Sequence, residues 1–142
     1  MAAKMPRPAG DSTKTVLAHV ENTLDPIIFP DSRVLLLGSM PSPKSREIGF
    51  YFGNPQNRFW RVVAALYGEK PLKSISEKID FCKRHHLALC DVLKACDIKG
   101  ASDASIANPI PHNIGALIQD SSICAIFTLG GTATKFYKRY TE

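Results

Sequence analysis

A segment between residues 38 and 61 gathers amides, hydroxyls, cations and aromatic rings. Its polar and basic members are Ser39, Ser42, Lys44, Ser45, Arg46, Asn54, Gln56, Asn57, Arg58 and Arg61, around the triplet Phe50-Tyr51-Phe52. Cations can hold phosphates, aromatic rings can stack on a base, and an amide can read a base edge with one donor and one acceptor. The combination predicts a pocket for a nucleic-acid base. The alternative is an ordinary long loop whose aromatic rings plug the core.

The neighbouring elements predict where this segment lies. Residues 34–37 form a short apolar run, typical of a parallel strand buried on both faces, and Gly38 lets the backbone turn at its end. Asn54-Pro55 then indicates the N-cap and first residue of a helix that Gly68 closes. The segment therefore joins a strand end to a helix start. Ligands bind at that place in open α/β sheets, and helix-start amides favour anions.

The rest of the chain predicts alternating helices and strands. After a flexible tail over residues 1–11, we expect a helix from Ser12 or Thr13 to about Asn22, a helix from Ser74 to His86, a strand over 87–92, a long loop over 97–112, a short helix over 114–119, a strand over 123–128 and a last helix after Gly130-Gly131. This order predicts an α/β fold with a central parallel sheet between two helix layers. Residues 12–142 are expected to form a single domain.

Composition narrows the class of protein. A chain of 142 residues with 44% hydrophobic residues can bury the core of one domain. Its net charge of +5 permits polyanionic partners such as DNA without requiring them. The apolar runs are too short to span a bilayer, and the first residues lack the apolar core of a signal peptide. We therefore expect a cytoplasmic protein with no membrane partner.

The four cysteines predict reduced thiols and no metal site. Cys82, Cys90, Cys96 and Cys124 include no pair spaced C-x-x-C. Cys82 lies near two histidines at 85 and 86, but no second pair of ligands matches it. Those histidines better fit the negative end of a helix dipole. We expect neither a metal nor another cofactor.

Three stretches of the sequence share the motifs of one family. They are Gly38-Ser-Met-Pro-Ser42 with residues 44–60, Asp91–Cys96 with residues 105–111, and Ile126–Gly131 with the helix after it. Together they resemble the uracil-DNA glycosylase superfamily, most closely its hypoxanthine-DNA (deoxyinosine) glycosylase branch. The resemblance covers roughly residues 14 to 141. It implies a monofunctional, metal-free DNA repair enzyme that hydrolyses the N-glycosidic bond of hypoxanthine, with uracil as a further substrate.

The resemblance assigns the central role to Asn57. Many branches carry Asn or Asp two residues after the first glycine of the strand-end motif, where it orients water, but this chain has Met40 there. A thioether cannot do that work. In the hypoxanthine branch the asparagine of the Asn-Arg-Phe-Trp run is critical, and that residue corresponds to Asn57. Its alternative role is to cap the first turn of the helix.

The other expected site residues fall into two groups. The base pocket is expected to contain Gly38, Ser39, Met40, Pro41, Tyr51, Phe52 and Gly130, and DNA phosphates are expected to contact Ser42, Lys44, Ser45, Arg46 and Arg58. Tyr51 is the first choice for stacking on the base, with Phe50 or Phe52 equally able if the loop turns differently. Asp91 could be a pocket acid, but we favour turn hydrogen bonds for it. Ser105, Asn108 and His112 are lesser candidates.

Two features depart from the family pattern. Leu129-Gly130 stands where relatives often have Asn-Gly, and the sequence ends before the fourth strand and the DNA-inserting loop of the family. With the family strand order 2-1-3-4, the strand over 123–128 should therefore lie at a sheet edge. We expect a shortened chain, monomeric when complete, whose own activity is low. The rival interpretations are a non-catalytic DNA-binding relative and an α/β module that binds a free nucleotide.

Overall fold

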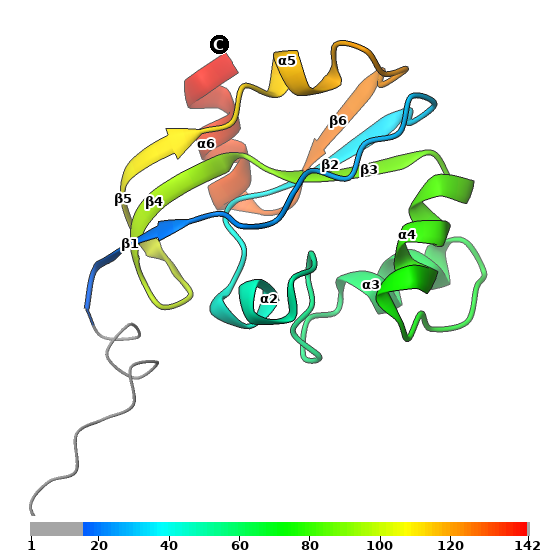
Figure 1. Cartoon of the computed structure of the whole chain (residues 1–142), viewed down its shortest axis with the longest axis horizontal. Coiled ribbons are helices and arrows are strands. Elements are labelled where there is room, and N and C mark those ends of the chain that lie inside the picture. The colour runs from blue at the N-terminus through cyan, green and yellow to red at the C-terminus, as the bar shows by residue number, and fades with distance from the viewer. Residues whose placement is uncertain (1–15, 142) are drawn as a thin grey trace, which may run out of the picture.

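The computed structural model describes residues 16–141 and contains two three-stranded sheets (Figure 1). The strands are β1 (Ala18–Glu21), β2 (Val34–Gly38), β3 (Leu87–Asp91), β4 (Leu93–Lys99), β5 (Ser102–Pro111) and β6 (Ala125–Thr128). The helices are α2 (Pro43–Ile48), α3 (Phe59–Leu66), α4 (Ile75–Arg84), α5 (Ile114–Ile118) and α6 (Gly131–Thr141). The predicted tail over residues 1–11 lies outside the described residues.

One sheet is parallel and has the strand order β3-β2-β6. This is the order expected from the sequence, with the first apolar run in the centre. In the register, Gly38 at the end of β2 lies beside Asp91 at the end of β3, and Leu37 lies beside Thr128 at the end of β6. The carboxyl ends of all three strands therefore meet at one edge. Within the described part of the chain β6 pairs only with β2, so the predicted sheet edge is present.

Helices cover both faces of the parallel sheet, which confirms the predicted three layers (Figure 1). Successive strand residues point to opposite faces. On one face, Leu35, Leu37, Ala88 and Cys90 share a core cluster with Ile114 of α5 and Phe136 of α6. On the other face, Leu36, Leu87 and Leu89 share a cluster with Trp60 and Val63 of α3 and with Phe81 and Cys82 of α4. Buried apolar residues in alternating positions thus hold α5 and α6 above the sheet and α3 and α4 below it.

The second sheet is antiparallel, with the order β1-β4-β5, and it corrects two predictions. The helix expected up to Asn22 is the strand β1 over its described part. Its apolar residues also fit a period of two, with Ala18 and Val20 half-buried and His19 and Glu21 exposed. The loop expected over 97–112 is the β4–β5 hairpin. Gly100, with φ of +54°, makes its turn, and backbone pairing supplies the order that the turn-rich composition does not suggest.

The segment between β2 and α3 also differs from its prediction. Helix α3 begins at Phe59 and not after Asn54-Pro55, because the Asn54 side chain accepts a hydrogen bond only from the Gln56 N–H (3.0 Å) and forms a local turn. A short helix, α2, occupies the middle of the segment. Ser42 caps it by accepting a hydrogen bond from the Ser45 N–H (3.1 Å), and Gly49 ends it with φ of +82°. Most of the predicted loop is therefore ordered by its own hydrogen bonds.

The cysteine side chains are free thiols, three of them buried. Burial raises the pKa of both Cys82 and Cys90 to about 12, so these thiols stay protonated and unreactive at neutral pH. Among residues 16–141, no three His, Cys, Asp or Glu side chains gather closely enough to hold a metal ion. Every helix in that range is too short or too polar to cross a membrane.

Candidate active site

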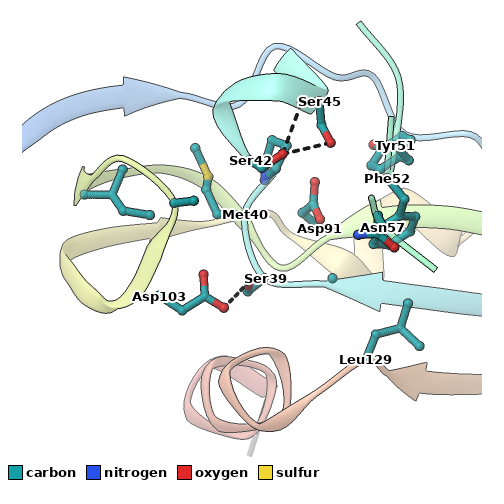
Figure 2. A pocket seen from close by; sticks show the side chains of 14 residues that line it. Ser39, Met40, Ser42, Ser45, Tyr51, Phe52, Asn57, Asp91, Asp103 and Leu129 are labelled. Atoms are coloured by element: carbon teal, nitrogen blue, oxygen red, sulfur yellow. Dashed lines mark hydrogen bonds between the residues drawn. The ribbon is translucent and has the colours of Figure 1, made fainter. Parts of the chain in front are cut away.

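A cavity of about 180 Å³ opens at the carboxyl edge of the parallel sheet (Figure 2). Its lining comes from the ends of β2 and β3, from the segment between β2 and α3, and from the β4–β5 hairpin. The lining residues are Gly38, Ser39, Met40, Pro41, Ser42, Ser45, Tyr51, Phe52, Asn57, Asp91, Ile98, Ala101, Asp103 and Leu129. Sites for drug-sized ligands usually occupy about 300–1,000 Å³. This smaller cavity suits one heterocyclic base better than a whole nucleotide.

The cavity brings together most of the residues that the sequence assigns to a base pocket. Of that set, Gly38, Ser39, Met40, Pro41, Tyr51 and Phe52 line it, and so does Asn57, the residue expected in the central role. Gly130 does not, because the adjacent Leu129 occupies that wall while Gly130 turns away with φ of +93° into α6. Leu129 stands where relatives often have Asn, so this wall offers an apolar contact to a base and no amide.

Asn57 lies at the mouth of the cavity, just before α3. Its Oδ1 accepts a hydrogen bond from the Phe59 N–H (2.8 Å), so the side chain is anchored to the first helical residue. This bond orients the amide and leaves Nδ2 without a hydrogen-bond partner among residues 16–141. The capping role and the base-reading role therefore coexist, since Oδ1 serves the first and Nδ2 is open for the second.

Among the three aromatic residues of the triplet, Phe52 is best placed to stack on a base. Phe50 is buried against Trp60, with 5.7 Å between the ring centroids. Tyr51 lines the cavity but is only 2% exposed, and its hydroxyl donates to the Asp25 carbonyl (3.0 Å). Phe52 is half-buried, its φ is +52°, and its ring is 4.1 Å from that of Phe59. The first choice from sequence, Tyr51, thus gives way to Phe52, which is held in a conformation rare for bulky residues.

Asp91 supplies a buried carboxyl group at the cavity wall, and here the preference for turn hydrogen bonds was wrong. Its side chain accepts a hydrogen bond from Asn22 Nδ2 (3.1 Å), the one partner among the described residues, and it faces the cavity (Figure 2). Burial raises the pKa of this carboxyl to about 7, the nearby Asp103 adds to the rise, and the Asn22 hydrogen bond opposes it. A carboxyl group that titrates near neutral pH can hold or give a proton there.

Gly38 allows the Asp91 carboxyl to approach the end of β2. A Cβ at residue 38 would lie 2.6 Å from Asp91 Oδ1 and 3.6 Å from Phe52 Cζ. Real Cβ atoms do not approach an oxygen so closely, and the neighbouring Asp91 backbone is fixed by the strand register. Only glycine fits at position 38, because any Cβ there would collide with the Asp91 carboxyl group. The two side chains that an added methyl group would meet, Asp91 and Phe52, both line the cavity.

We expect Gly38→Ala to displace the Asp91 carboxyl, to lower the free energy of unfolding by about 1–3 kcal/mol and to narrow the cavity. Thermal melting measures the loss of stability, and binding or turnover of a base-containing ligand measures the change in the cavity. Gly115→Ala in α5 is the matched control, because its Cβ would meet only Asn113 Oδ1 at 3.7 Å, an ordinary contact. Equal melting temperatures for the two variants would contradict the prediction.

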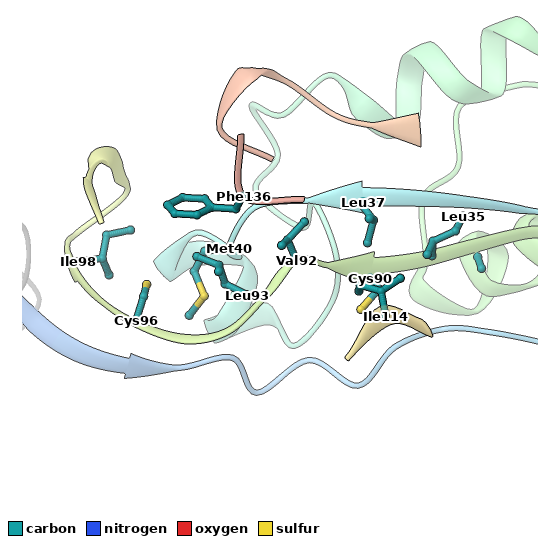
Figure 3. Close-up of a cluster of buried hydrophobic side chains, with 11 residues drawn as sticks. Leu35, Leu37, Met40, Cys90, Val92, Leu93, Cys96, Ile98, Ile114 and Phe136 are labelled. Atoms are coloured by element: carbon teal, nitrogen blue, oxygen red, sulfur yellow. The ribbon is translucent and has the colours of Figure 1, made fainter. Parts of the chain in front are cut away.

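Met40 belongs to the core as much as to the cavity. It is 9% exposed and packs with Leu93, Cys96 and Ile98 in the cluster that Figure 3 shows. Next to it, Ser39 Oγ donates to Asp103 Oδ2 (3.2 Å) and joins the loop after β2 to the β4–β5 hairpin. The residue at position 40 thus fixes the loop through packing, and the polar groups of this wall come from Asp91 and Asp103.

The five residues expected at DNA phosphates have different surroundings. Ser42 and Ser45 bond to each other (3.1 Å), and Ser45 Oγ also accepts from the Gly53 N–H, so both hydroxyls are engaged inside the segment. Lys44 is exposed, 3.6 Å from Glu47. Arg46 is half-buried, burial lowers its pKa, and its buried Nε has no partner among residues 16–141. Arg58 is exposed beside Asn57. Lys44 and Arg58 are thus the members of this set open to a large anion.

The lesser candidates from the second sheet do not line the cavity. Ser105 Oγ donates to the Ser102 carbonyl, Asn108 Nδ2 donates to Asp97, and His112 Nδ1 contacts the Asp91 carbonyl oxygen. Sequence reasoning missed Asp103, Ile98 and Ala101, named Leu129 only as a departure from the family pattern, and ranked Asp91 too low. A usable signal existed for Asp91, because two parallel strands that end in Gly38 and Asp91 place these residues side by side.

Comparison with known proteins agrees with this fold. The family model described as the uracil DNA glycosylase superfamily matches residues 26–141. A solved structure from Methanosarcina acetivorans, a protein provisionally assigned as a uracil DNA glycosylase, superposes with a TM-score of 0.74 at 26% identity and covers 84% of this chain and 75% of that one.

Two curated relatives are named hypoxanthine DNA glycosylase. That of Methanosarcina barkeri is 36% identical over 83 residues, which are 57% of this chain and 52% of the relative. That of Methanosarcina acetivorans is 35% identical over 83 residues, which are 58% of this chain and 52% of the relative. The chain spans about half the length of these relatives. Since the family match takes in the whole parallel sheet and every segment that lines the cavity, the chain belongs to the uracil-DNA glycosylase superfamily.

Proposed function

We propose that this protein hydrolyses the N-glycosidic bond of deaminated bases in DNA and prefers hypoxanthine to uracil. The observation that carries the proposal is the base-sized cavity in which an open amide, a stacking ring and a buried carboxyl group meet, contributed by Asn57, Phe52 and Asp91. The names of the two curated relatives support the preference for hypoxanthine. The base must leave the helix to enter such a cavity, which costs a few kcal/mol of unstacking and unpairing.

The Asn57 amide is proposed to read the edge that deamination creates. Hypoxanthine presents a C6 carbonyl beside an N1–H, whereas adenine presents an amino group beside an acceptor nitrogen. The free Asn57 Nδ2 can donate to the C6 carbonyl, and the remaining lone pair of Oδ1 can accept from N1–H. With adenine, the C6 amino group and Asn57 Nδ2 would be two hydrogen-bond donors facing each other. Phe52 would stack on the base and fix the plane of its ring.

Asp91 is proposed to act as the acid of the reaction. When the bond between C1′ and N9 breaks, the electron pair passes to the purine, and the protonated Asp91 carboxyl donates to N7 and neutralises the leaving base. Water adds to C1′ and its proton passes to solvent, after which Asp91 takes up a proton again. Burial without a cationic partner among the described residues favours the neutral acid, which this role requires. Uracil lacks N7 and would lose this contact.

The test is single-turnover release of free base from matched duplexes that contain deoxyinosine or deoxyuridine, with abasic product detected by alkaline cleavage. We expect abasic product from both and a faster rate with deoxyinosine. Faster release of uracil would overturn the preference. Salt-sensitive duplex binding without product would support a non-catalytic DNA-binding relative, and binding of a mononucleotide without binding of duplex would support a free-nucleotide module.

A further inference from the structure

A second cavity, of about 380 Å³, lies against the first and shares Phe52 and Asn57 with it. We call it the basic groove. Its lining residues are Ile48, Phe52, Gly53, Asn54, Pro55, Asn57, Trp60, Arg61, Leu72, Lys73, Ile75 and Lys78. Because the same two side chains form part of both walls, the two cavities adjoin, and a ligand chain that fills the first is within reach of the groove. Nothing in the base-release mechanism uses the groove itself.

The groove carries three cations and no lining acid. Arg61 comes from α3, Lys73 precedes α4, and Lys78 lies within α4. None of the ion pairs formed between described residues involves these three, in contrast to Lys44 with Glu47 and Arg84 with Glu69. Positive charge from two helices and the loop between them therefore converges on one cavity, and the nearby carboxylate of Glu77, which partly offsets the effect of burial on the pKa of Lys78, lies outside its lining.

Lys78 is the least exposed of the three cations. It is half-buried, and burial lowers its pKa. Its ammonium lies 5.6 Å from the centre of the Trp60 ring. Taking a cation out of water is unfavourable unless an opposite charge or good hydrogen bonds compensate. An anion in the groove would restore the pKa of Lys78 toward its ordinary value.

The floor between the cations is apolar. Ile48 is 38% exposed and Ile75 is 40% exposed, and Leu72 and Pro55 complete the surface between them. An inorganic anion would leave this surface in water. A ligand with a charged group on one side and a flat apolar group on the other covers both, and a nucleotide of single-stranded DNA has that form.

We propose that the basic groove binds the nucleotide next to the extruded one on the same DNA strand. Its phosphate contacts Arg61, Lys73 and Lys78, and its sugar and base cover Ile48 and Ile75. The position of the extruded base in the first cavity rests on the proposed function, but the charge and the apolar floor of the groove do not. Holding the neighbouring nucleotide opens the strand at the damaged base and adds contacts that offset the cost of extrusion.

The test variant is the triple substitution Arg61→Gln, Lys73→Gln and Lys78→Met, in which methionine keeps an apolar stem over Trp60. The control is Lys135→Gln, Lys138→Gln and Arg139→Gln in α6, which removes equal charge from the opposite helix layer (Figure 1). Dissociation constants for a deoxyinosine duplex are measured from 0.05 to 0.3 M salt. Loss of one phosphate contact should lower the slope of log K against log salt by about 0.7–0.9, with roughly 5- to 8-fold weaker binding at 0.1 M salt.

Neutral methylphosphonate linkages, placed singly on either side of the deoxyinosine, locate the contact. We expect one of them to weaken binding by the wild-type protein and to have little further effect on the triple variant. Equal slopes for the triple variant and the α6 control, or methylphosphonate effects that persist in the triple variant, would overturn the inference. These outcomes depend on binding alone. If the binding results are as expected but the wild-type protein releases no base, the groove assignment stands and the proposed function is refuted.

Discussion

Asn57→Ala is expected to slow single-turnover release of hypoxanthine by about 100- to 1,000-fold, the usual cost of removing one donor to a charge that develops in the transition state. Affinity for the duplex should stay within a few-fold, because the Nδ2 contact strengthens only as the base leaves with negative charge. The rate is measured with enzyme in excess and the affinity by titration of an uncleaved duplex.

The helix-start hydrogen bond of Asn57 requires a control for stability. Asn57→Ala also removes the acceptor of the Phe59 N–H, and a lost cap of this kind costs about 0.5–2 kcal/mol. Asn57→Asp keeps that acceptor and removes only the donor, so it should melt near the wild-type temperature and remain inactive. Asn113→Ala removes a comparable cap from α5, where Oδ1 accepts from the Ala116 N–H (3.1 Å), and should retain activity. An active Asn57→Asp variant would show that Asn57 only caps the helix.

The sequence predicted the parallel sheet because each of its strands has a local signal that is typical of a buried strand. An apolar run such as residues 34–37, closed by glycine, fits a strand buried on both faces. The antiparallel sheet had no such signal. Its β5 strand, Ser102–Pro111, is rich in Ser, Asn and Pro, and backbone pairing with β4 determines its conformation. Pairing of this kind depends on the partner strand, and the propensity of the β5 residues alone does not report it.

The candidate site was predictable where the residues were close in sequence. The segment from Gly38 to Asn57 provides most of the lining, and its residue types indicated a base pocket. The carboxyl groups were not predictable in this way. Asp91 enters through the register of two parallel strands, and Asp103 enters through a hairpin that was expected to be a loop. Tyr51 was preferred to Phe52 because sequence does not reveal which ring of a triplet is buried and which stays accessible in the cavity.

Asp91→Asn is expected to stabilise the protein at pH 8 while it removes activity. The folded-state pKa of Asp91 is about 7, against an ordinary value of 3.8, so the folded protein holds a proton that the unfolded chain loses between these values. The free energy of unfolding therefore falls as pH rises from about 4 to about 7 and is lowest above that range. At about 1.4 kcal/mol per pKa unit, burial of the ionised carboxyl costs up to about 4 kcal/mol at pH 8.

Asparagine avoids that cost because it is neutral at every pH. Its side-chain oxygen can still accept the hydrogen bond that Asn22 Nδ2 now gives to Asp91. Thermal melting at pH 5 and pH 8 measures the effect. The wild-type melting temperature should be lower at pH 8 than at pH 5. At pH 8 the variant should melt roughly 10 °C higher than the wild type. A variant that melts lower than the wild type at pH 8 would show that the native carboxyl is stably ionised.

The rate of base release should respond to pH in the same range. If protonated Asp91 gives its proton to the leaving purine, the wild-type rate is constant below pH 7 and falls about tenfold per unit above it. The Asp91→Asn variant should be slower by about 100- to 10,000-fold at pH 6 and show no such fall, since an amide donates a hydrogen bond but transfers no proton. Asp97→Asn is the matched control, because hydrogen bonds from Asn108 and His19 lower the pKa of Asp97 and it does not line the cavity. Should the Asp91→Asn variant keep the wild-type pH profile, another group supplies the proton, and Asp91 is left with a positioning role beside Gly38.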